Sequence, residues 1–471
     1  MQTRILLCIL FFLLNDCKLI QAQFVSVADA GVSLFEESRQ VIEQECISDE
    51  EYLILERRCR ENMKALNISV VQDSGNENVL QLLDWPLRAA NGLTDCNFYH
   101  ISAYVDHNIT TGTIQDFNCG TITYDSHKGT DISIWPFSFY KMDNDLVEVI
   151  SAAPGIIIDK HDGEFDRNCA ATTVSANYVF IQHSDGSHAL YWHMKNGSIT
   201  NKAIGQSVVA GELLGVVGSS GSSSGPHLHF EIWSGGTVST RVDPYSGSCN
   251  LLNPASWWIS QKPYREPSIL KASVHTTDAV FPGCPLTETS NESTVFQVPF
   301  QGPGLAPGYA KFYVFFRNEQ SGLSADISIL NPNGSTFSSW TYTSANDARV
   351  RSWAWSKLLP TIPGTYTFRA TYNGTECSSD FEITTSTDVS EQLANSGLRL
   401  YPNPSTGIFS FENARSEVLE ITLFDIRGVA VFQSALNFGL TDFDLSFEKG
   451  LYYYKVRGKD GFICSGKLLI Q

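Results

Sequence analysis

Three short segments of the chain carry histidine and carboxylate residues at spacings that suit a metal centre. They are His127-Lys-Gly-Thr-Asp131, Tyr191-Trp-His193 and Gly225-Pro-His227-Leu-His229-Phe-Glu231. If the third segment is a strand, alternation places His227 and His229 on one face and the apolar residues between them on the other. Two imidazoles on one face of a strand can reach the same ion or the same substrate.

These residue types favour zinc chemistry. Zinc binds neutral imidazole nitrogen and carboxylate oxygen in tetrahedral geometry, and a catalytic site leaves its fourth position to water. His127 and Asp131 add an imidazole and a carboxylate to the histidine pair. The chain has no His-Glu-x-x-His motif to supply a glutamate base, so we expect histidines outside the ligand set to handle protons.

Read in order, these motifs resemble the lysostaphin/LytM-type zinc metalloendopeptidases, and residues 149–155 and 205–218 fit the same pattern. The resemblance covers about residues 121–245. It implies that His127, Asp131 and His229 bind Zn²⁺. It also implies that His193 and His227 assist catalysis by orienting or deprotonating water and by stabilising the oxyanion. The implied substrates are peptidoglycan cross-links or Gly-rich peptides.

Two segments are longer than the corresponding loops of that family, namely residues 134–145 and 160–176. We expect them to shape the walls of the substrate groove. The Gly/Ser-rich residues 218–225 predict a flexible loop before the histidine strand. Its lack of a following Lys-Ser/Thr argues against a phosphate-binding loop.

The remaining histidines are expected to be structural or exposed, because a single histidine on a strand is seldom a ligand. They are His100, His107, His161, His183, His188 and His275.

The N-terminus predicts export. Arg4 is followed by an unbroken apolar run over residues 5–14 and by the small Ala22, which is typical of a secretory signal peptide over 1–22. Residues 23–90 follow as a helical N-terminal segment with one or two amphipathic helices, including apolar positions from Val32 to Ile42. This segment is a possible propeptide whose side chain fills the open zinc position, so its removal should raise activity.

Composition excludes some partners. The net charge of -18 disfavours nucleic-acid binding, because it would repel a polyanion. No apolar stretch after residue 22 is long enough to predict a membrane span. A length of 471 residues predicts about three domains, and an aromatic content of 12% with 35 glycines favours a mainly β architecture.

The domain pattern follows from strand and turn signals. Short strands separated by Gly-rich turns over 91–262 predict a β-sheet-rich LytM-type peptidase domain. Residues 263–388 predict an Ig-like β-sandwich accessory domain, and residues 389–471 a small C-terminal β-sandwich.

The C-terminal module carries a second resemblance. It begins with Leu398-Arg-Leu-Tyr-Pro-Asn-Pro-Ser-Thr-Gly407 and ends with Gly466-Lys-Leu-Leu-Ile-Gln471. It is similar to the C-terminal sorting domain of the type IX secretion system of Bacteroidetes. The resemblance implies the type IX secretion machinery as a partner and a location that is secreted or at the outer cell surface.

Nine cysteines remain after the predicted signal peptide, and an exported chain should pair them. Neighbour pairing predicts Cys46–Cys59, Cys96–Cys119, Cys169–Cys249 and Cys284–Cys377, with Cys464 left over.

Two functions fit the sequence. The first is a secreted zinc metalloendopeptidase that acts on peptide or peptidoglycan substrates. The alternative is a catalytically inactive cell-wall or matrix-binding surface protein, which the tandem β modules and the sorting signal would also serve.

Overall fold

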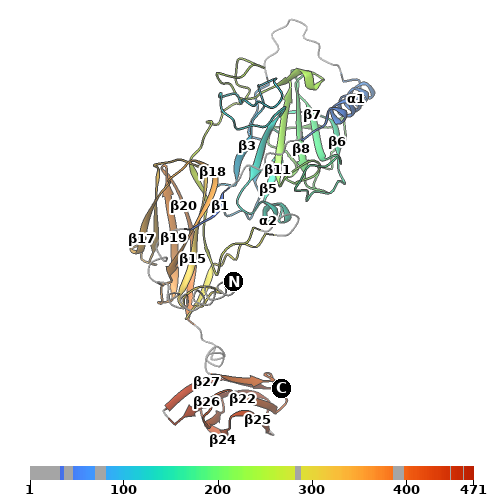
Figure 1. Cartoon of the computed structure of the whole chain (residues 1–471). Helices are drawn as coiled ribbons and strands as arrows, with labels where there is room; N and C mark the ends of the chain where they lie inside the picture. Colours follow the sequence, from blue (N-terminus) through green and yellow to red (C-terminus); the bar gives the residue numbers. More distant parts are fainter. Residues whose placement is uncertain are drawn as a thin grey trace, which may run out of the picture. The chain divides into compact units, whose positions relative to one another are not determined.

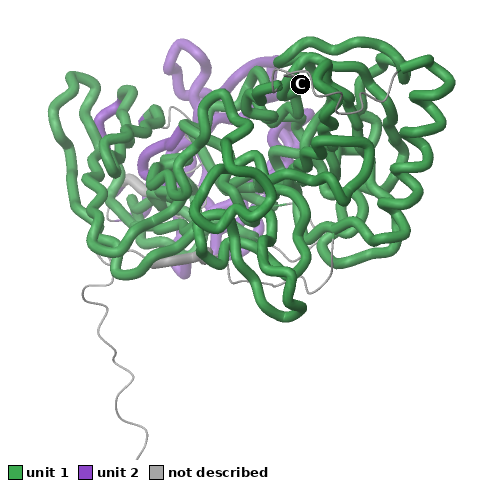
Figure 2. Tube along the Cα trace, turned by 90° about the horizontal axis from the view of Figure 1, so that it is seen from above, with its two compact units in different colours: residues 1–294, 301–360, 364–382 green, residues 295–300, 361–363, 383–471 purple. Residues whose placement is uncertain are grey.

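The computed structural model describes residues 32–36, 46–68, 81–281, 288–385, 397–445, 447–459 and 461–471. The predicted signal peptide, residues 1–22, and the apolar positions Val41 and Ile42 lie outside these ranges. The chain divides into two compact units (Figure 2), of which the first holds residues 1–294, 301–360 and 364–382. The described chain is strand-rich with few helices, which confirms the mainly β prediction.

One part of the first unit is built on an antiparallel sheet that carries residues of all three histidine motifs (Figure 1). Its strand order is β3-β4-β11-β8-β7-β6-β9, and β12 (Arg241–Val242) pairs with β11. The bounds are β3 Tyr99–Ala103, β4 Thr130–Ile134, β6 Gly155–His161, β7 Asn177–Gln182, β8 His188–Met194, β9 Ser207–Val208 and β11 His227–Trp233.

The two faces of this sheet bury different residues. Leu228, Phe230 and Ile232 of β11 enter the main core, as alternation predicts. That core also receives residues of a three-stranded sheet in the order β10-β5-β2, with bounds β2 Leu87–Ala89, β5 Val147–Ile150 and β10 Leu213–Val216. The opposite face of β11 is therefore the one that presents His227 and His229.

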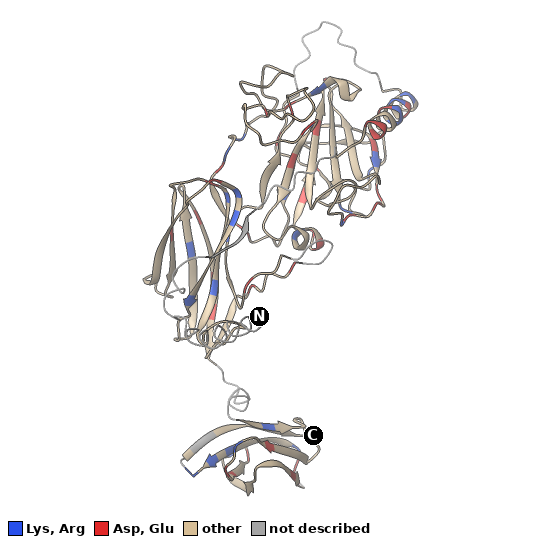
Figure 3. Cartoon of the chain, in the orientation of Figure 1, with Lys and Arg blue, Asp and Glu red and all other residues tan. Residues whose placement is uncertain are grey.

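Helix α1 (Asp49–Ala65) lies on that opposite face, beside β6 (Figure 1). Ser48 caps it, because the Ser48 side chain and the Glu51 side chain bond each other's backbone N–H. The helix carries both acidic and basic residues (Figure 3), while Tyr52, Leu55, Cys59 and Met63 are buried against the sheet.

The helix prediction for the N-terminal segment was wrong in one part. Val32–Glu36 forms a strand, β1, which pairs antiparallel with β18 (Ala348–Leu358) of the following domain. A β-prone run takes up strand structure when a sheet edge offers its unpaired N–H and C=O groups.

A β-sandwich follows within the same unit. One sheet has the order β1-β18-β15-β13, and the other contains β20-β19-β16-β17. The bounds are β13 Ser268–His275, β15 Tyr309–Glu319, β16 Ser324–Leu330, β17 Thr336–Thr343, β19 Gly364–Tyr372 and β20 Thr375–Thr385. The strand β14 (Val295–Val298) is assigned to the second unit.

The segment that follows β4 packs on this sandwich. Trp135 and Phe137 share a buried cluster with Leu270, Tyr313 and Phe315. The short helix α2 (Ser138–Asp143) comes next. Residues 135–137 therefore pack on strands of the sandwich, and the expected role of residues 134–145 as a groove wall stays a prediction.

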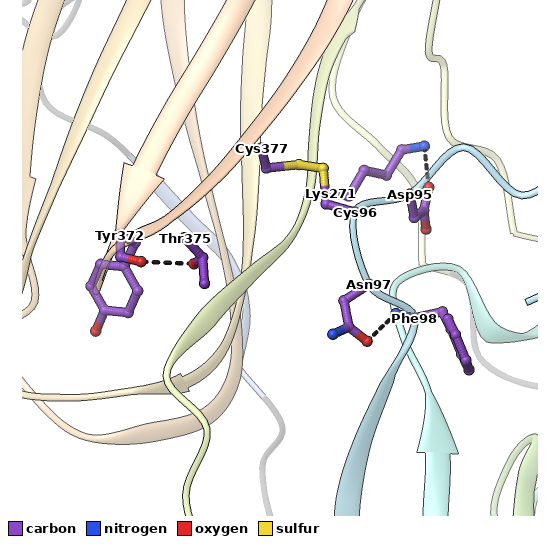
Figure 4. Close-up of a disulfide and its surroundings, with 8 residues drawn as sticks. All are labelled: Asp95, Cys96, Asn97, Phe98, Lys271, Tyr372, Thr375 and Cys377. Atoms are coloured by element: carbon purple, nitrogen blue, oxygen red, sulfur yellow. Dashed lines mark hydrogen bonds and ion pairs between the residues drawn. A yellow bond between two sulfur atoms is a disulfide. The ribbon is translucent and has the colours of Figure 1, made fainter. Parts of the chain in front are cut away.

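Disulfides connect distant segments, so the neighbour pairing was largely wrong. Cys96 pairs with Cys377 across 281 residues, which ties the peptidase region to β20 (Figure 4). Beside this bond, Lys271 contacts Asp95 at 2.7 Å. Cys119 pairs with Cys249. Chain topology, which sequence spacing does not reveal, decides which cysteines approach each other.

The other cysteines complete this correction. Cys46 and Cys59 are buried free thiols rather than a disulfide. Cys169 is disulfide-bonded, but not to Cys249, which pairs with Cys119. Cys284 lies outside the described residues. Cys464 is a buried thiol, in agreement with the prediction.

The second unit contains the C-terminal module. It has a sheet of order β21-β22-β25 and a sheet of order β24-β23-β26-β27, which enclose one core. The bounds are β21 Leu398–Tyr401, β22 Ile408–Asn413, β23 Leu419–Phe424, β24 Ala430–Leu436, β25 Gly439–Asp444, β26 Gly450–Gly458 and β27 Gly461–Ile470. In the described part of the chain, no helix has the length and apolar character needed to cross a membrane.

Candidate metal centre and active site

Strand pairing brings the first two motifs together. In the β4–β11 ladder, Asp131 lies opposite His229 and Ser133 lies opposite His227. Directly paired residues share a face of the sheet, so Asp131 and the two histidines point to the same side. His127 precedes β4 and reaches this side from the loop.

Three ligand atoms converge at this point. His127 Nε2 and His229 Nδ1 are 3.1 Å apart. Asp131 Oδ1 lies 3.2 Å from the first nitrogen and 2.8 Å from the second. All three residues are buried.

Hydrogen bonds fix which nitrogen each ligand presents. His127 Nδ1 donates to the carbonyl oxygen of Tyr104 at 2.7 Å, so Nε2 is left with its lone pair. His229 Nε2 donates to the carboxylate of Glu231 at 2.8 Å, which leaves Nδ1 for a ligand. A histidine held by an acceptor on its far nitrogen is the usual arrangement of a metal ligand.

The donor set fits zinc. Ligand atoms at about 2.0–2.1 Å from a tetrahedral zinc stand roughly 3.3 Å apart, close to the separations found here. Two neutral imidazoles and one carboxylate also match zinc's preferred ligand types. The glycine of the first motif protects this geometry, because a Cβ on Gly129 would lie 2.7 Å from His229 Cε1.

His193 joins the site through an irregularity in β8. Its neighbour Trp192 pairs with His229 and shares its face, so regular alternation would point His193 into the opposite core. Instead His193 has a φ of 69°, and its ring lies 4.5 Å from that of His227 and 5.9 Å from that of His229. A left-handed conformation at a non-glycine residue marks a position held by its surroundings, often for function.

The Gly/Ser loop holds His193 and His227. His193 Nδ1 donates to the carbonyl of Ser220 at 2.5 Å, and His227 Nδ1 donates to that of Gly225 at 2.8 Å. The Nε2 atoms of both histidines are buried and have no hydrogen-bond partner among the described residues. Each histidine therefore aims one unused nitrogen at the centre.

The prediction that residues 218–225 form a flexible loop was wrong. Ser219, Ser220 and Ser223 are buried. The Ser220 hydroxyl donates to the carbonyl of Met194 at 2.8 Å and accepts from the N–H of Asn177 at 3.0 Å. The serines order the loop because the surrounding strands supply partners for their hydroxyls.

The second long loop lies beside this one. Ser219 Oγ donates to the carbonyl of Asn168 at 2.7 Å, and Asn168 Nδ2 donates to that of Gly221 at 2.9 Å. The segment 160–176 thus supports the loop that positions the catalytic candidates.

Burial and charge set the protonation of the site. Burial alone would raise the pKa of Asp131, but His127 and His227 hold it well below its ordinary value. Burial lowers the pKa of His193, and the neighbouring His227 adds to this effect. Asp131 is therefore an anion, and His193 favours its neutral form.

Three further residues complete the site, although the sequence analysis gave them no role. Glu231 fixes His229 and also accepts from Trp233 Nε1 at 2.8 Å and from the Tyr52 hydroxyl at 2.5 Å. Tyr124 stacks on His127 with ring centres 4.2 Å apart. Cys46 lies in the cluster with the three ligand candidates. Only Glu231 carried a sequence signal, because it stands two positions after His229 on one strand face.

Comparison with known proteins agrees with this geometry. Residues 125–244 match the model of peptidase family M23, and residues 399–471 match that of a secretion system C-terminal sorting domain. The chain thus contains an M23 domain, the lysostaphin/LytM type, and a sorting domain that directs secretion to the cell surface or outside, as the two resemblances predict.

Individual relatives match over short stretches. The chain is 32% identical over 101 residues to the cell division protein DipM of Caulobacter vibrioides, which is 21% of this chain and 16% of that protein. It is 47% identical over 55 residues, 12% of each chain, to the DD-carboxypeptidase/endopeptidase Mpg of Neisseria meningitidis serogroup B. The chain therefore spans less than a fifth of the length of these relatives.

Among solved structures, the catalytic domain of lysostaphin from Staphylococcus simulans is 22% identical. That likeness covers 30% of this chain and 85% of the other, with a TM-score of 0.20.

Proposed function

We propose that this chain is an exported zinc metalloendopeptidase whose metal ligands are His127, Asp131 and His229. One observation carries the proposal: five buried side chains from three segments converge, and each of the four histidines has one nitrogen fixed by an acceptor while the other faces the centre. Buried polar atoms are usually paired, and a bound metal and substrate would give these converging nitrogens their partners.

The chain's own residues divide the work. A zinc ion at this site supplies Lewis acidity and lowers the pKa of water near it. His193, with Nδ1 donating to Ser220, offers the lone pair of Nε2 to a water proton. His227 Nε2 lies 3.6 Å from Asp131 Oδ1 and is placed to donate to a developing oxyanion when protonated. The buried setting strengthens both interactions.

The proposed substrate class is peptidoglycan cross-links or Gly-rich peptides. Support comes from the M23 match and from the name of the Neisseria relative, a DD-carboxypeptidase/endopeptidase. Release outside the cell through the sorting domain would bring the enzyme to such substrates.

The first test measures zinc per chain by elemental analysis, with His229→Ala as the variant and His275→Gln, in the sandwich, as the matched control. We expect about one zinc in the wild type and in the control, and none in His229→Ala. A screen of cell-wall and Gly-rich peptides then follows. A well-folded wild-type chain that does not bind added zinc would contradict the proposal and favour the alternative of an inactive binding protein.

A further inference from the structure

Cys46 is a buried thiol that comes from outside the sheet and ends in the metal centre. It lies just before helix α1, in the segment 46–68. We infer that Cys46 is the fourth metal ligand of the intact chain, and that the segment 46–68 keeps the peptidase latent until this thiolate leaves. The inference rests on the proposed function, and it names the residue and the chemistry of its regulation.

Distances support the ligand assignment. The Cys46 sulfur and the ligand atoms of His127, Asp131 and His229 all lie within 4.8 Å of one another. The Tyr124 hydroxyl, which stands 3.5 Å from Asp131 Oδ2, is 2.7 Å from the same sulfur. A thiolate is a preferred zinc ligand, with a bond of about 2.3 Å. The four atoms form the set that a closed tetrahedral site requires.

A second observation points the same way. His193 and His227 also form a potential ligand group with Cys46. Their Nε2 atoms are the buried ones that have no hydrogen-bond partner in the described chain. The sulfur thus occupies the space toward which both catalytic candidates are aimed. Water or a scissile carbonyl would need that same space.

Helix α1 holds the thiol there. Its buried side chains pack on Tyr178, Phe180 and Trp192 of the sheet. Arg58 pairs with Asp159 at 3.0 Å, and Asn62 Nδ2 donates to the carbonyl of Ile158 at 2.9 Å. A segment docked this firmly keeps the sulfur at a high effective concentration beside the metal.

One contact joins the helix directly to the site. The Tyr52 hydroxyl donates to Glu231, and Glu231 in turn accepts from His229 Nε2. Cys46, Ile47 and Tyr52 also line one pocket together with His127 and His229. The docked segment therefore covers the site and contacts its supporting residues.

The ligand exchange balances simply. When the thiol binds, its proton passes to solvent and the sulfur donates an electron pair to the metal. When water displaces it, the thiolate takes up a proton and no redox change occurs. Cleavage of the chain after α1 would favour this exchange, because the segment 46–68 would then be held only by its docking contacts and by the upstream pairing of β1 with β18.

The structure also limits how much of the N-terminal segment can be removed. Leu83 bridges to Trp258, and β2 pairs with β5 in the peptidase core. A truncation of 23–90 would delete these contacts. The removable part therefore ends before Leu83, and its removal also takes away β1, which pairs with β18.

The test uses the full chain loaded with Co²⁺, which reports a thiolate ligand through a near-ultraviolet sulfur-to-cobalt charge-transfer band. The variants are Cys46→Ala and Cys59→Ala, the latter removing the other buried thiol of the segment. Iodoacetamide labelling of Cys46, read by mass spectrometry with and without metal, needs no variant and is independent of folding changes.

We expect the band in the wild type and in Cys59→Ala, its loss in Cys46→Ala, and metal-dependent protection of Cys46 from labelling. Peptide hydrolysis by Cys46→Ala should rise about 10–100-fold, because activity follows the fraction of chains with an open fourth position. One bound Co²⁺ without the band in the wild type, or a band that persists in Cys46→Ala, would overturn the inference.

These outcomes separate the two proposals. Hydrolysis by a wild type that lacks the band would leave the proposed function standing and defeat the latency. A band in the wild type, with no hydrolysis of any tested peptide by Cys46→Ala, would defeat both the proposed function and the latency, and leave only the ligand assignment.

Discussion

Buried histidines of the peptidase sheet and of the β-sandwich differ in how many of their nitrogens are satisfied. In the sandwich, His275 Nδ1 donates to the carbonyl of Ser290 at 2.5 Å, and its Nε2 accepts from Ser273 Oγ at 2.7 Å. In the peptidase site, His193 Nδ1 donates to the carbonyl of Ser220, and its Nε2 has no hydrogen-bond partner among the described residues. An unpaired buried polar atom costs stability, and the ring of His193 that carries it lies close to the rings of His227 and His229.

A third histidine sharpens this contrast within the peptidase region itself. His107 Nε2 lies 2.9 Å from Asp243, and its Nδ1 accepts from the N–H of Leu251 at 3.1 Å. It was expected to be structural, and both nitrogens are occupied. His188 of β8, however, has no hydrogen-bond partner at either ring nitrogen among the described residues, so an unpaired nitrogen marks a site histidine only where several of them converge.

The largest effect is expected from His193→Ala. The variant should keep about one zinc, because His193 is not in the proposed ligand set, yet peptide hydrolysis should fall about 10²–10⁴-fold through loss of proton transfer. Initial rates are measured on the Cys46→Ala background to avoid latency, with His107→Asn as the comparison. A rate within threefold of the parent, roughly 0.7 kcal/mol in barrier, would contradict the assigned role.

A smaller effect is expected from Glu231→Gln. The amide oxygen can still accept from His229 Nε2, but the negative charge that raises the basicity of the ligand is lost, so metal affinity should fall about 10–100-fold. Competition with a chelator measures it. Tyr52→Phe removes only the bond from α1 and serves as the control for rearrangement around Glu231. An affinity equal to that of the wild type would show that Glu231 only fills space.

The smallest effect concerns the pH dependence of the unfolding free energy at His275, whose two ring nitrogens both have hydrogen-bond partners. Burial lowers the pKa of His275 to about 3, against an ordinary value of 6.5. Its depressed folded-state pKa means that its stabilising contribution is complete above pH 6.5 and is lost as pH falls toward 3. Across that window, it should add about 1.4 kcal/mol per pH unit to the loss of unfolding free energy.

Urea unfolding of the full chain at pH 7 and pH 5 measures this loss of unfolding free energy, and His275→Gln should reduce it by about 2 kcal/mol. If the variant and the wild type lose stability in parallel between these pH values, another group is responsible for the acid sensitivity.

Prediction from the sequence was most complete at β11, where the two-residue period of a strand was sufficient. Alternation alone places His227 and His229 on one face and Leu228 in the core, and both features are found. The strand-rich class, the M23 motifs and the sorting domain were equally readable, because each depends on residue order within a short window.

The resemblance was needed for His193. Alternation would have turned this side chain to the wrong face of β8, and only its left-handed backbone brings it to the site. The buried Gly/Ser loop was misread for a similar reason: serines look flexible until neighbouring strands supply their hydrogen-bond partners.

The sequence by itself determined the donor types, their order and the polar face that carries them, because these follow from covalent neighbours and the two-residue period of a strand. Only the tertiary structure decided which cysteines meet. Cys96 reaches Cys377 across 281 residues, while Cys46 stays unpaired 13 residues from Cys59 and enters the metal centre instead. Contacts of this kind depend on how sheets and helices pack, since a disulfide or a metal site selects groups by distance and direction in space.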